Sequence, residues 1–122
     1  MDKKKSVVII IVIIILIYFF QIREEADTMV IKVAGWDMEY TVSNRKLTIE
    51  DFESVEMGSS LNEIEKKFGK PDGWVGGGIL LPVYILEDKS AVELVFNNDI
   101  SYVDLEAIYL YKGESEFVLK TK

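Results

Sequence analysis

The chain has 122 residues, a formal net charge of −7, no histidine and no cysteine. Its fold therefore has no disulfides, and it lacks the commonest general base and metal ligand. Residues 23–122 carry 20 acidic and 11 basic side chains, a formal charge of −9. A surface of this charge repels phosphate backbones, so we expect no nucleic-acid partner. We also expect no cofactor and no metal, because the sequence contains neither a phosphate-binding motif nor a spaced calcium loop.

Residues 6–22 form an uncharged and mainly apolar run, SVVIIIVIIILIYFFQI, directly after Lys3, Lys4 and Lys5. A helix over this run would reach roughly 25 Å, at the short end of what spans a bilayer. Basic residues that flank a span are retained on the cytoplasmic side, so the three lysines set the topology. The sequence predicts a cytoplasmic basic region at 1–5, a single-pass transmembrane anchor at 6–22, a spacer at 23–27 and an extracytoplasmic domain at 28–122.

The alternative is a signal peptide, removed to release a secreted domain. Signal peptides end in small residues before the cleavage point. Here the run passes through Tyr18, Phe19 and Phe20, and Ala26 has Glu24 two positions before it. This pattern favours retention of the segment in the cell membrane.

After the spacer, Met29–Val33 and Met38–Val42 are expected to form a short β-hairpin around a turn at 34–37. Leu47–Val55 is predicted to be a short helix, capped by Thr48 with Asp51 at the third helical position. Ser60–Phe68 is the clearest helix. Ser60 and Glu63 have capping-box spacing, Leu61, Ile64 and Phe68 form one apolar stripe, and Gly69 and Pro71 end it.

Four strands are expected to follow, at 79–86, 91–96, 103–110 and 116–120, with turns at 87–90, 97–99 and 112–115. Pro82 confines the first strand to an edge or a bulge. Val103 and Leu105 are out of phase with Ile108 and Leu110, which predicts a bulge near Glu106 and Ala107. Short turns require antiparallel neighbours, so the prediction is an α+β domain: a helix-loop-helix on one face of a four-stranded antiparallel meander.

Residues from about 48 to 120 resemble the SmpA/OmlA and β-lactamase-inhibitor-protein-like superfamily. The matching positions are Gly58, Ser60, Glu63, Ile64, Phe68, Gly69, Lys70, Pro71 and Tyr84, together with the turn at 87–90. The resemblance implies a helix-loop-helix on a four-stranded antiparallel sheet, in an exported bacterial envelope protein that acts by contact, as scaffold or inhibitor, without catalysis. Members on the outer membrane are lipoproteins, whereas this chain has no cysteine to acylate. A role in outer-membrane assembly is therefore not carried over.

Two patterns are candidates for catalytic or ligand sites. Gly76, Gly77 and Gly78 resemble a phosphate loop, but a strand rather than a helix follows them, so they are interpreted as a flexible connector. Acid pairs occur at Glu50–Asp51, Glu87–Asp88 and Asp104–Glu106. Two carboxyl groups in one cleft would suit a small hydrolase.

The stronger functional signal is aromatic. Tyrosine and tryptophan suit interfaces because they combine apolar area with a polar tip. The candidate interaction surface consists of Trp74, Tyr84, Tyr102, Tyr109 and Tyr111, some of which are expected on the sheet face away from the helices. The sequence therefore predicts a membrane-anchored, outward-facing, non-catalytic module that binds a protein or envelope component. The alternatives are an inhibitor or immunity-type protein against a basic partner, and a small carboxylate-dependent hydrolase.

Overall fold

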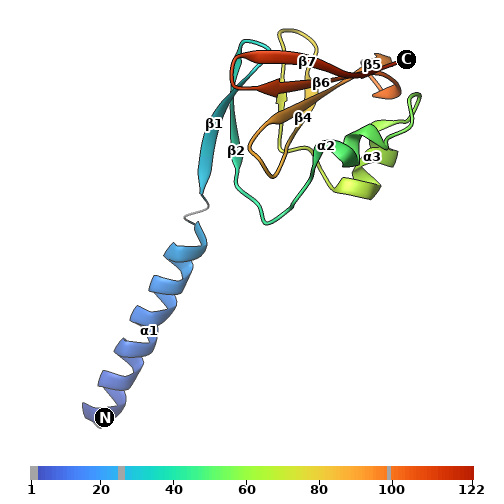
Figure 1. The fold of residues 1–122 in the computed structure, drawn as a ribbon. Coiled ribbons are helices and arrows are strands. Elements are labelled where there is room, and N and C mark those ends of the chain that lie inside the picture. Colours follow the sequence, from blue (N-terminus) through green and yellow to red (C-terminus); the bar gives the residue numbers. More distant parts are fainter. Residues whose placement is uncertain (1–2, 25–26, 99) are drawn as a thin grey trace.

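The computed structural model describes residues 3–24, 27–98 and 100–122, with the side chains of the first helix described as far as Tyr18. Figure 1 shows a long helix, α1 (Lys3–Glu24), followed by a domain formed by the rest of the chain. Among the residues described in this way, no helix is long and apolar enough to cross a membrane. Met1 and Asp2 of the expected basic region, Glu25 and Ala26 of the expected spacer, and Asp99 of an expected turn lie outside the described residues.

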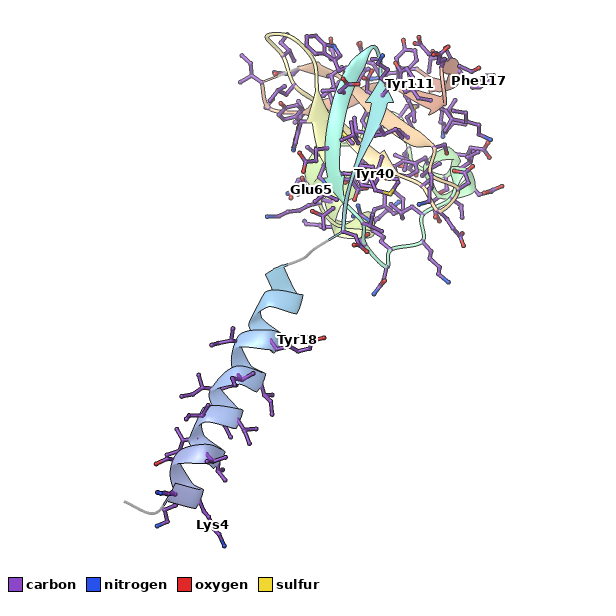
Figure 2. The ribbon with its side chains drawn as sticks, turned by 90° about the vertical axis from the view of Figure 1, so that its left-hand side faces the viewer. Lys4, Tyr18, Tyr40, Glu65, Tyr111 and Phe117 are labelled. Atoms are coloured by element: carbon purple, nitrogen blue, oxygen red, sulfur yellow. The ribbon has the colours of Figure 1, made fainter. Side chains whose placement is uncertain are left out.

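Helix α1 begins at Lys3, so the three lysines lie in its first turn instead of before it. Every side chain from Val7 to Tyr18 is exposed, with exposed fractions between 48% and 63%. Figure 2 shows these side chains pointing away from the helix axis in all directions. This segment has no polar face, unlike a helix that packs on a globular core.

The domain contains β1 (Thr28–Val33), β2 (Trp36–Thr41), α2 (Ile49–Glu53), α3 (Leu61–Phe68), β3 (Gly73–Val75), β4 (Leu81–Ile85), β5 (Ala91–Asn98), β6 (Val103–Lys112) and β7 (Ser115–Thr121). Strands β1 and β2 form a hairpin, and β3 to β7 form a five-stranded antiparallel meander in sequence order. The predicted α+β class is confirmed. The predicted strand number was too small, because no strand was predicted at Gly73–Val75, which pairs with Leu81–Val83.

The hairpin and helix ends follow from local chemistry. The turn is shorter than predicted, since only Ala34 and Gly35 separate the strands, both with the positive φ of two-residue hairpin turns. The capping box of α2 is confirmed: the Thr48 hydroxyl accepts from Asp51 N, and Asp51 Oδ2 accepts from Thr48 N at 2.9 Å. Ser60 caps α3 by accepting from Glu63 N at 3.2 Å.

The sheet separates two apolar cores. The core beneath the helices is formed by Leu47, Phe52, Val55, Leu61, Ile64, Tyr84, Leu86, Val92, Leu94, Phe96, Leu105, Ile108 and Leu110. The core beneath the hairpin is formed by Val33, Met38, Tyr40, Val75, Val83, Ala91 and Tyr111. Some of the candidate aromatic residues were expected to be available on the sheet face away from the helices. The hairpin covers much of this face, because alternate residues of β1 and β2 are apolar and pack on the sheet.

The predicted bulge in β6 is confirmed. Val95 pairs with Ala107 and Phe96 pairs with Leu105, which leaves Glu106 as the extra residue. The inserted residue returns Ile108 to the helix-side core that Leu105 also enters. Pro82 pairs with Trp74, and the β4–β5 ladder begins only at Val83, so Pro82 lies beyond the part of β4 that has two neighbours.

Candidate functional site

The five candidate aromatic residues do not form one surface. Tyr84 is completely buried in the helix-side core, and Tyr111 is buried beneath the hairpin. The Tyr84 hydroxyl donates to the Gly69 carbonyl at 2.7 Å, and burial raises the pKa of this hydroxyl. Burial and the neighbouring charge of Glu93 likewise raise the pKa of Tyr111. Tyr84 and Tyr111 therefore stabilise the two cores and contribute nothing to an exposed surface.

Trp74 and Tyr102 do come together at one end of the sheet. Their ring centroids lie 5.3 Å apart, and the Tyr102 hydroxyl donates to the Leu80 carbonyl at 2.9 Å. The exposed fractions are 39% for Trp74, 50% for Ile79 and 49% for Leu80. We call Trp74, Ile79, Leu80 and Tyr102 the aromatic tip. Ile79 and Leu80 were not predicted to be site residues because they were interpreted as part of the following strand.

The backbone holds Tyr102 in a strained conformation. Its φ is +51°, in the left-handed region that bulky side chains rarely adopt. Tyr102 N donates to the Asn98 carbonyl and Leu61 N donates to the Tyr102 carbonyl, both at 2.9 Å. Strain of this kind persists where surrounding contacts enforce it, and it is concentrated at functional positions. The Tyr102 ring packs edge-on against the Trp74 ring.

The aromatic tip lies far along the hairpin from α1. A Cβ built on Gly77, in the loop between Trp74 and Ile79, would lie 3.2 Å from the Trp36 ring, so this loop packs on the start of β2. Trp36 and Thr41 are the two ends of β2, roughly 17 Å apart along an extended strand. Figure 1 shows the turn of the hairpin pointing away from α1. The tip therefore faces away from the first helix.

Tyr109, the remaining candidate, is partly buried against the hairpin-side core and is paired with Glu93 across the sheet. Glu93 is a carboxyl group inside the sheet, with only 5% of its surface exposed. Burial, and to a lesser degree the charge of Glu116, raise the pKa of Glu93 above its ordinary value of 4.5. The folded state therefore binds the Glu93 proton more tightly than the unfolded state does.

Replacing this residue in a Glu93→Gln variant is expected to stabilise the domain at pH 7. Between the ordinary pKa and the raised folded-state pKa the native state holds more protons, so the contribution of Glu93 to stability falls as pH rises. The difference in unfolding free energy between variant and wild type should be near zero below pH 4.5 and grow to a plateau above the folded-state pKa. Urea unfolding across pH measures it. The exposed Glu114→Gln variant is the control, and equal pH profiles of the two variants would contradict the expectation.

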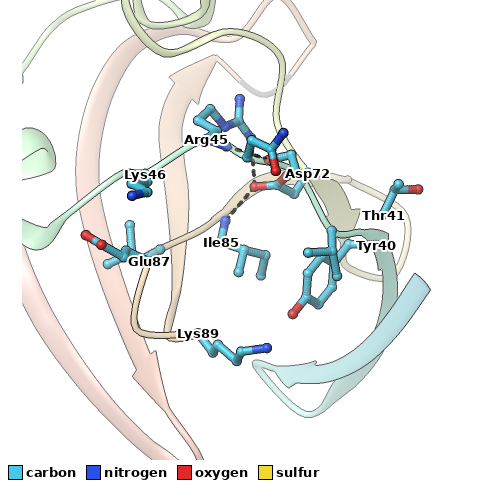
Figure 3. A pocket seen from close by; sticks show the side chains of 12 residues that line it. Tyr40, Thr41, Arg45, Lys46, Asp72, Ile85, Glu87 and Lys89 are labelled. Carbon is cyan, nitrogen blue, oxygen red and sulfur yellow. Dashed lines mark hydrogen bonds and ion pairs between the residues drawn. The ribbon is translucent and has the colours of Figure 1, made fainter. Parts of the chain in front are cut away.

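A second site, missed in the sequence, surrounds Arg45. Arg45 Nη1 donates to the carbonyls of Phe68 at 2.7 Å and Lys70 at 2.8 Å, and Nη2 pairs with Asp72 at 2.8 Å. Asp72 also accepts from Ile85 N at 2.7 Å. Figure 3 shows this ion pair beside an open cavity between the end of β2 and the β4–β5 turn. The cavity has a volume of about 400 Å³. The only sequence signal was a basic pair, Arg45 and Lys46, in a mainly acidic domain.

The acid pairs that prompted the hydrolase alternative have different surroundings. Glu50, Glu87 and Asp88 line one smaller cavity of about 270 Å³. Hydrogen bonds from the hydroxyl and the backbone N–H of Ser90 lower the pKa of Asp88. Asp104 instead pairs with Lys122, which lowers its pKa. Glycoside hydrolysis requires a proton-donating carboxyl group of raised pKa beside a second carboxylate. Glu93 is a carboxyl group of raised pKa, but it lies in the sheet and does not line the cavity formed by Glu50, Glu87 and Asp88.

Within the described ranges, no group of three or more acidic, histidine or cysteine side chains is arranged to hold a metal ion. Comparison of the chain with protein-family models, curated proteins and solved structures finds no match. The site is therefore interpreted from its own geometry.

Proposed function

We propose that this protein is a membrane-anchored interaction module whose domain lies outside the cell and binds a protein partner through the aromatic tip, without catalysis. The observation that carries the proposal is the tip itself. Large apolar side chains are gathered at the end of the domain farthest from α1, around a tyrosine held in a strained conformation. Exposed aromatic residues in rigid surroundings are typical of binding hot spots.

The membrane anchor is part of the same proposal. Its support is the uncharged run at 6–22, the helical backbone of α1 from Lys3 to Glu24, and the exposure of apolar side chains around the helix. Isoleucine, valine and leucine near a helix centre each favour insertion by about 0.3–0.6 kcal/mol. The lysines of the first turn would remain on the cytoplasmic side, which places the domain outside.

We include in the proposal the resemblance of residues from about 48 to 120 to the SmpA/OmlA and β-lactamase-inhibitor-protein-like superfamily, whose members act by contact.

The alternative of an inhibitor or immunity-type protein is favoured by the formal charge of −9 on residues 23–122. Binding to a basic partner would weaken steeply as salt is raised, because charge complementarity is screened.

Capture of the partner tests the role of the tip. The full chain is purified from detergent-solubilised membranes in wild-type form and as an Ile79→Ser, Leu80→Ser double variant. We expect the variant to lose at least about 10-fold of the captured partner, because hot-spot side chains each contribute 2 kcal/mol or more. Both side chains are half exposed, so the domain should remain folded.

The matched control is Phe117→Ser, Val118→Ser, two exposed apolar side chains of β7 with exposed fractions of 51% and 57%. This variant should capture the partner as the wild type does. Equal capture by all three proteins would contradict binding at the tip.

The anchor is tested separately, by protease added to intact cells. A domain that resists digestion on intact cells and is cleaved only after lysis would contradict the outward orientation.

A further inference from the structure

The open cavity beside Arg45 lies at the end of the domain that the chain ties to α1. Asp27 accepts a hydrogen bond from Val42 N at 2.8 Å, and Val42 lines the cavity. Only three peptide units join Glu24, the end of α1, to Asp27, so they span at most about 11 Å. Wherever α1 ends, the cavity remains close to it. If α1 lies in a membrane, as proposed above, the cavity is held at the headgroup layer.

The lining of this cavity holds more basic than acidic side chains, in a domain that is acidic as a whole. Arg45, Lys46 and Lys89 line it together with two carboxylates, Asp72 and Glu87. The Arg45 guanidinium and the Asp72 carboxylate pair at 2.8 Å, so their charges largely offset each other. The charges left in the lining are the cations of Lys46 and Lys89 and the carboxylate of Glu87. Lys46 and Lys89 are both exposed, and the hydroxyls of Thr41 and Ser43 supply neutral donors beside them. This arrangement suits an oxyanion that accepts several hydrogen bonds.

Lys89 occupies a position at which lysine is unfavourable. Its φ is +69°, in the turn between β4 and β5, where glycine or asparagine would avoid strain. The turn is closed by Leu86 N donating to the Ser90 carbonyl at 2.8 Å. Lys89 Nζ lies 3.7 Å from Met29 Sδ, so the side chain reaches across to β1, beside the link to α1. A strained residue that places a cation at this rim is consistent with a binding role.

We propose that this cavity binds the phosphate group of an anionic lipid headgroup, in the membrane leaflet from which α1 emerges. Lys46 and Lys89 contact the phosphate, while Arg45, held by Asp72 and by the carbonyls of Phe68 and Lys70, forms a rigid floor beside them. The inference rests on the membrane anchor proposed above. The physical consequence of lipid binding is a preferred orientation of the domain relative to the membrane, because a lipid bound in the cavity attaches the domain to the bilayer at a second point.

The test uses the isotope-labelled full chain in neutral maltoside micelles, titrated with dihexanoylphosphatidylglycerol. We expect saturable changes in the amide NMR shifts of residues 42–46 and of Lys89. A lysine near an anionic surface contributes about fivefold to affinity, so a Lys46→Gln, Lys89→Gln double variant should bind about 25-fold more weakly. The matched control, Lys66→Gln, Lys67→Gln on α3, removes the same charge away from the cavity lining and should bind as the wild type does.

Titrations with inorganic phosphate and with dihexanoylphosphatidylcholine identify the source of the phosphate. Stronger binding of phosphatidylglycerol than of either supports the lipid assignment. Equal shifts with inorganic phosphate would overturn that assignment in favour of free phosphate, and the absence of shifts in the cavity would overturn the site. Flotation of the full chain with liposomes separates the two proposals: a chain that floats but shows no shifts keeps its anchor and loses the site, whereas a chain that does not float loses both.

Discussion

An Arg45→Met variant is expected to lower the free energy of unfolding by about 3 kcal/mol, because it leaves a partly buried carboxylate without its cation. The guanidinium donates to two carbonyls at the end of α3, pairs with Asp72 and lies 5.3 Å from the centre of the Tyr84 ring. The Asp72 side chain is only 9% exposed, so solvent replaces little of what is lost. Urea unfolding of the full chain in neutral detergent, followed by tryptophan fluorescence, measures the change.

An Arg45→Lys variant should recover less than half of this loss. Lysine keeps the charge but lacks the planar fork that reaches the Phe68 and Lys70 carbonyls and Asp72 at once. The Lys70→Met variant is the control, because Lys70 contributes its main-chain carbonyl to this contact and should lose little stability. A loss below 1 kcal/mol for Arg45→Met would mean that the ion pair is dispensable.

The second large effect is expected at Gly76, where alanine should cost about 3 kcal/mol. Its φ of +133° lies in a region open almost only to glycine, and such strain alone costs about 1–3 kcal/mol. In addition, a Cβ on Gly76 would lie 2.2 Å from the carbonyl oxygen of Ile79, a backbone atom that cannot move aside without shifting the turn. The same unfolding measurement in urea applies.

Gly78→Ala provides the comparison. Gly78 also has a positive φ, +95°, but a Cβ there meets nothing within 4 Å. The Gly78→Ala variant should therefore lose only the stability that backbone strain costs, with no further loss from a collision. If the two variants were equally stable, the expected collision between a Cβ at position 76 and the Ile79 carbonyl oxygen would be contradicted. A Gly76→Ala variant that unfolds less readily than wild type would contradict both the backbone strain and the collision.

Local features of the fold were predictable because neighbouring residues determine them. Thr48 and Asp51 form their capping box within a single turn, and the phase change between Leu105 and Ile108 can be seen in the sequence without knowing any partner strand. The position of the hairpin was not predictable in this way. Val33 and Met38 are buried against residues such as Val83, some 45 to 50 positions later, and no local pattern specifies that contact.

The candidate surface was predicted only in part for the same reason. The strand that contains Tyr84 is apolar on both faces, so its periodicity could not tell which face Tyr84 shares with the helices. Trp74 was singled out by residue type alone, and its contact with Tyr102 joins strand β3 to the turn between β5 and β6, which are far apart in the sequence. Arg45 was missed because two of its partners are main-chain carbonyls, which any residue provides.

The covering of the sheet by β1 and β2 has a mechanical consequence. Strand β1 pairs with β2, and this two-stranded sheet shares no ladder with the five-stranded sheet. A pull transmitted from the first helix would thus enter through Thr28 and reach the rest of the domain mainly across side-chain contacts such as those of Val33 and Tyr40. Under tension the hairpin would peel away first, exposing Tyr111 and Glu93 to solvent while the helices and the meander stay intact.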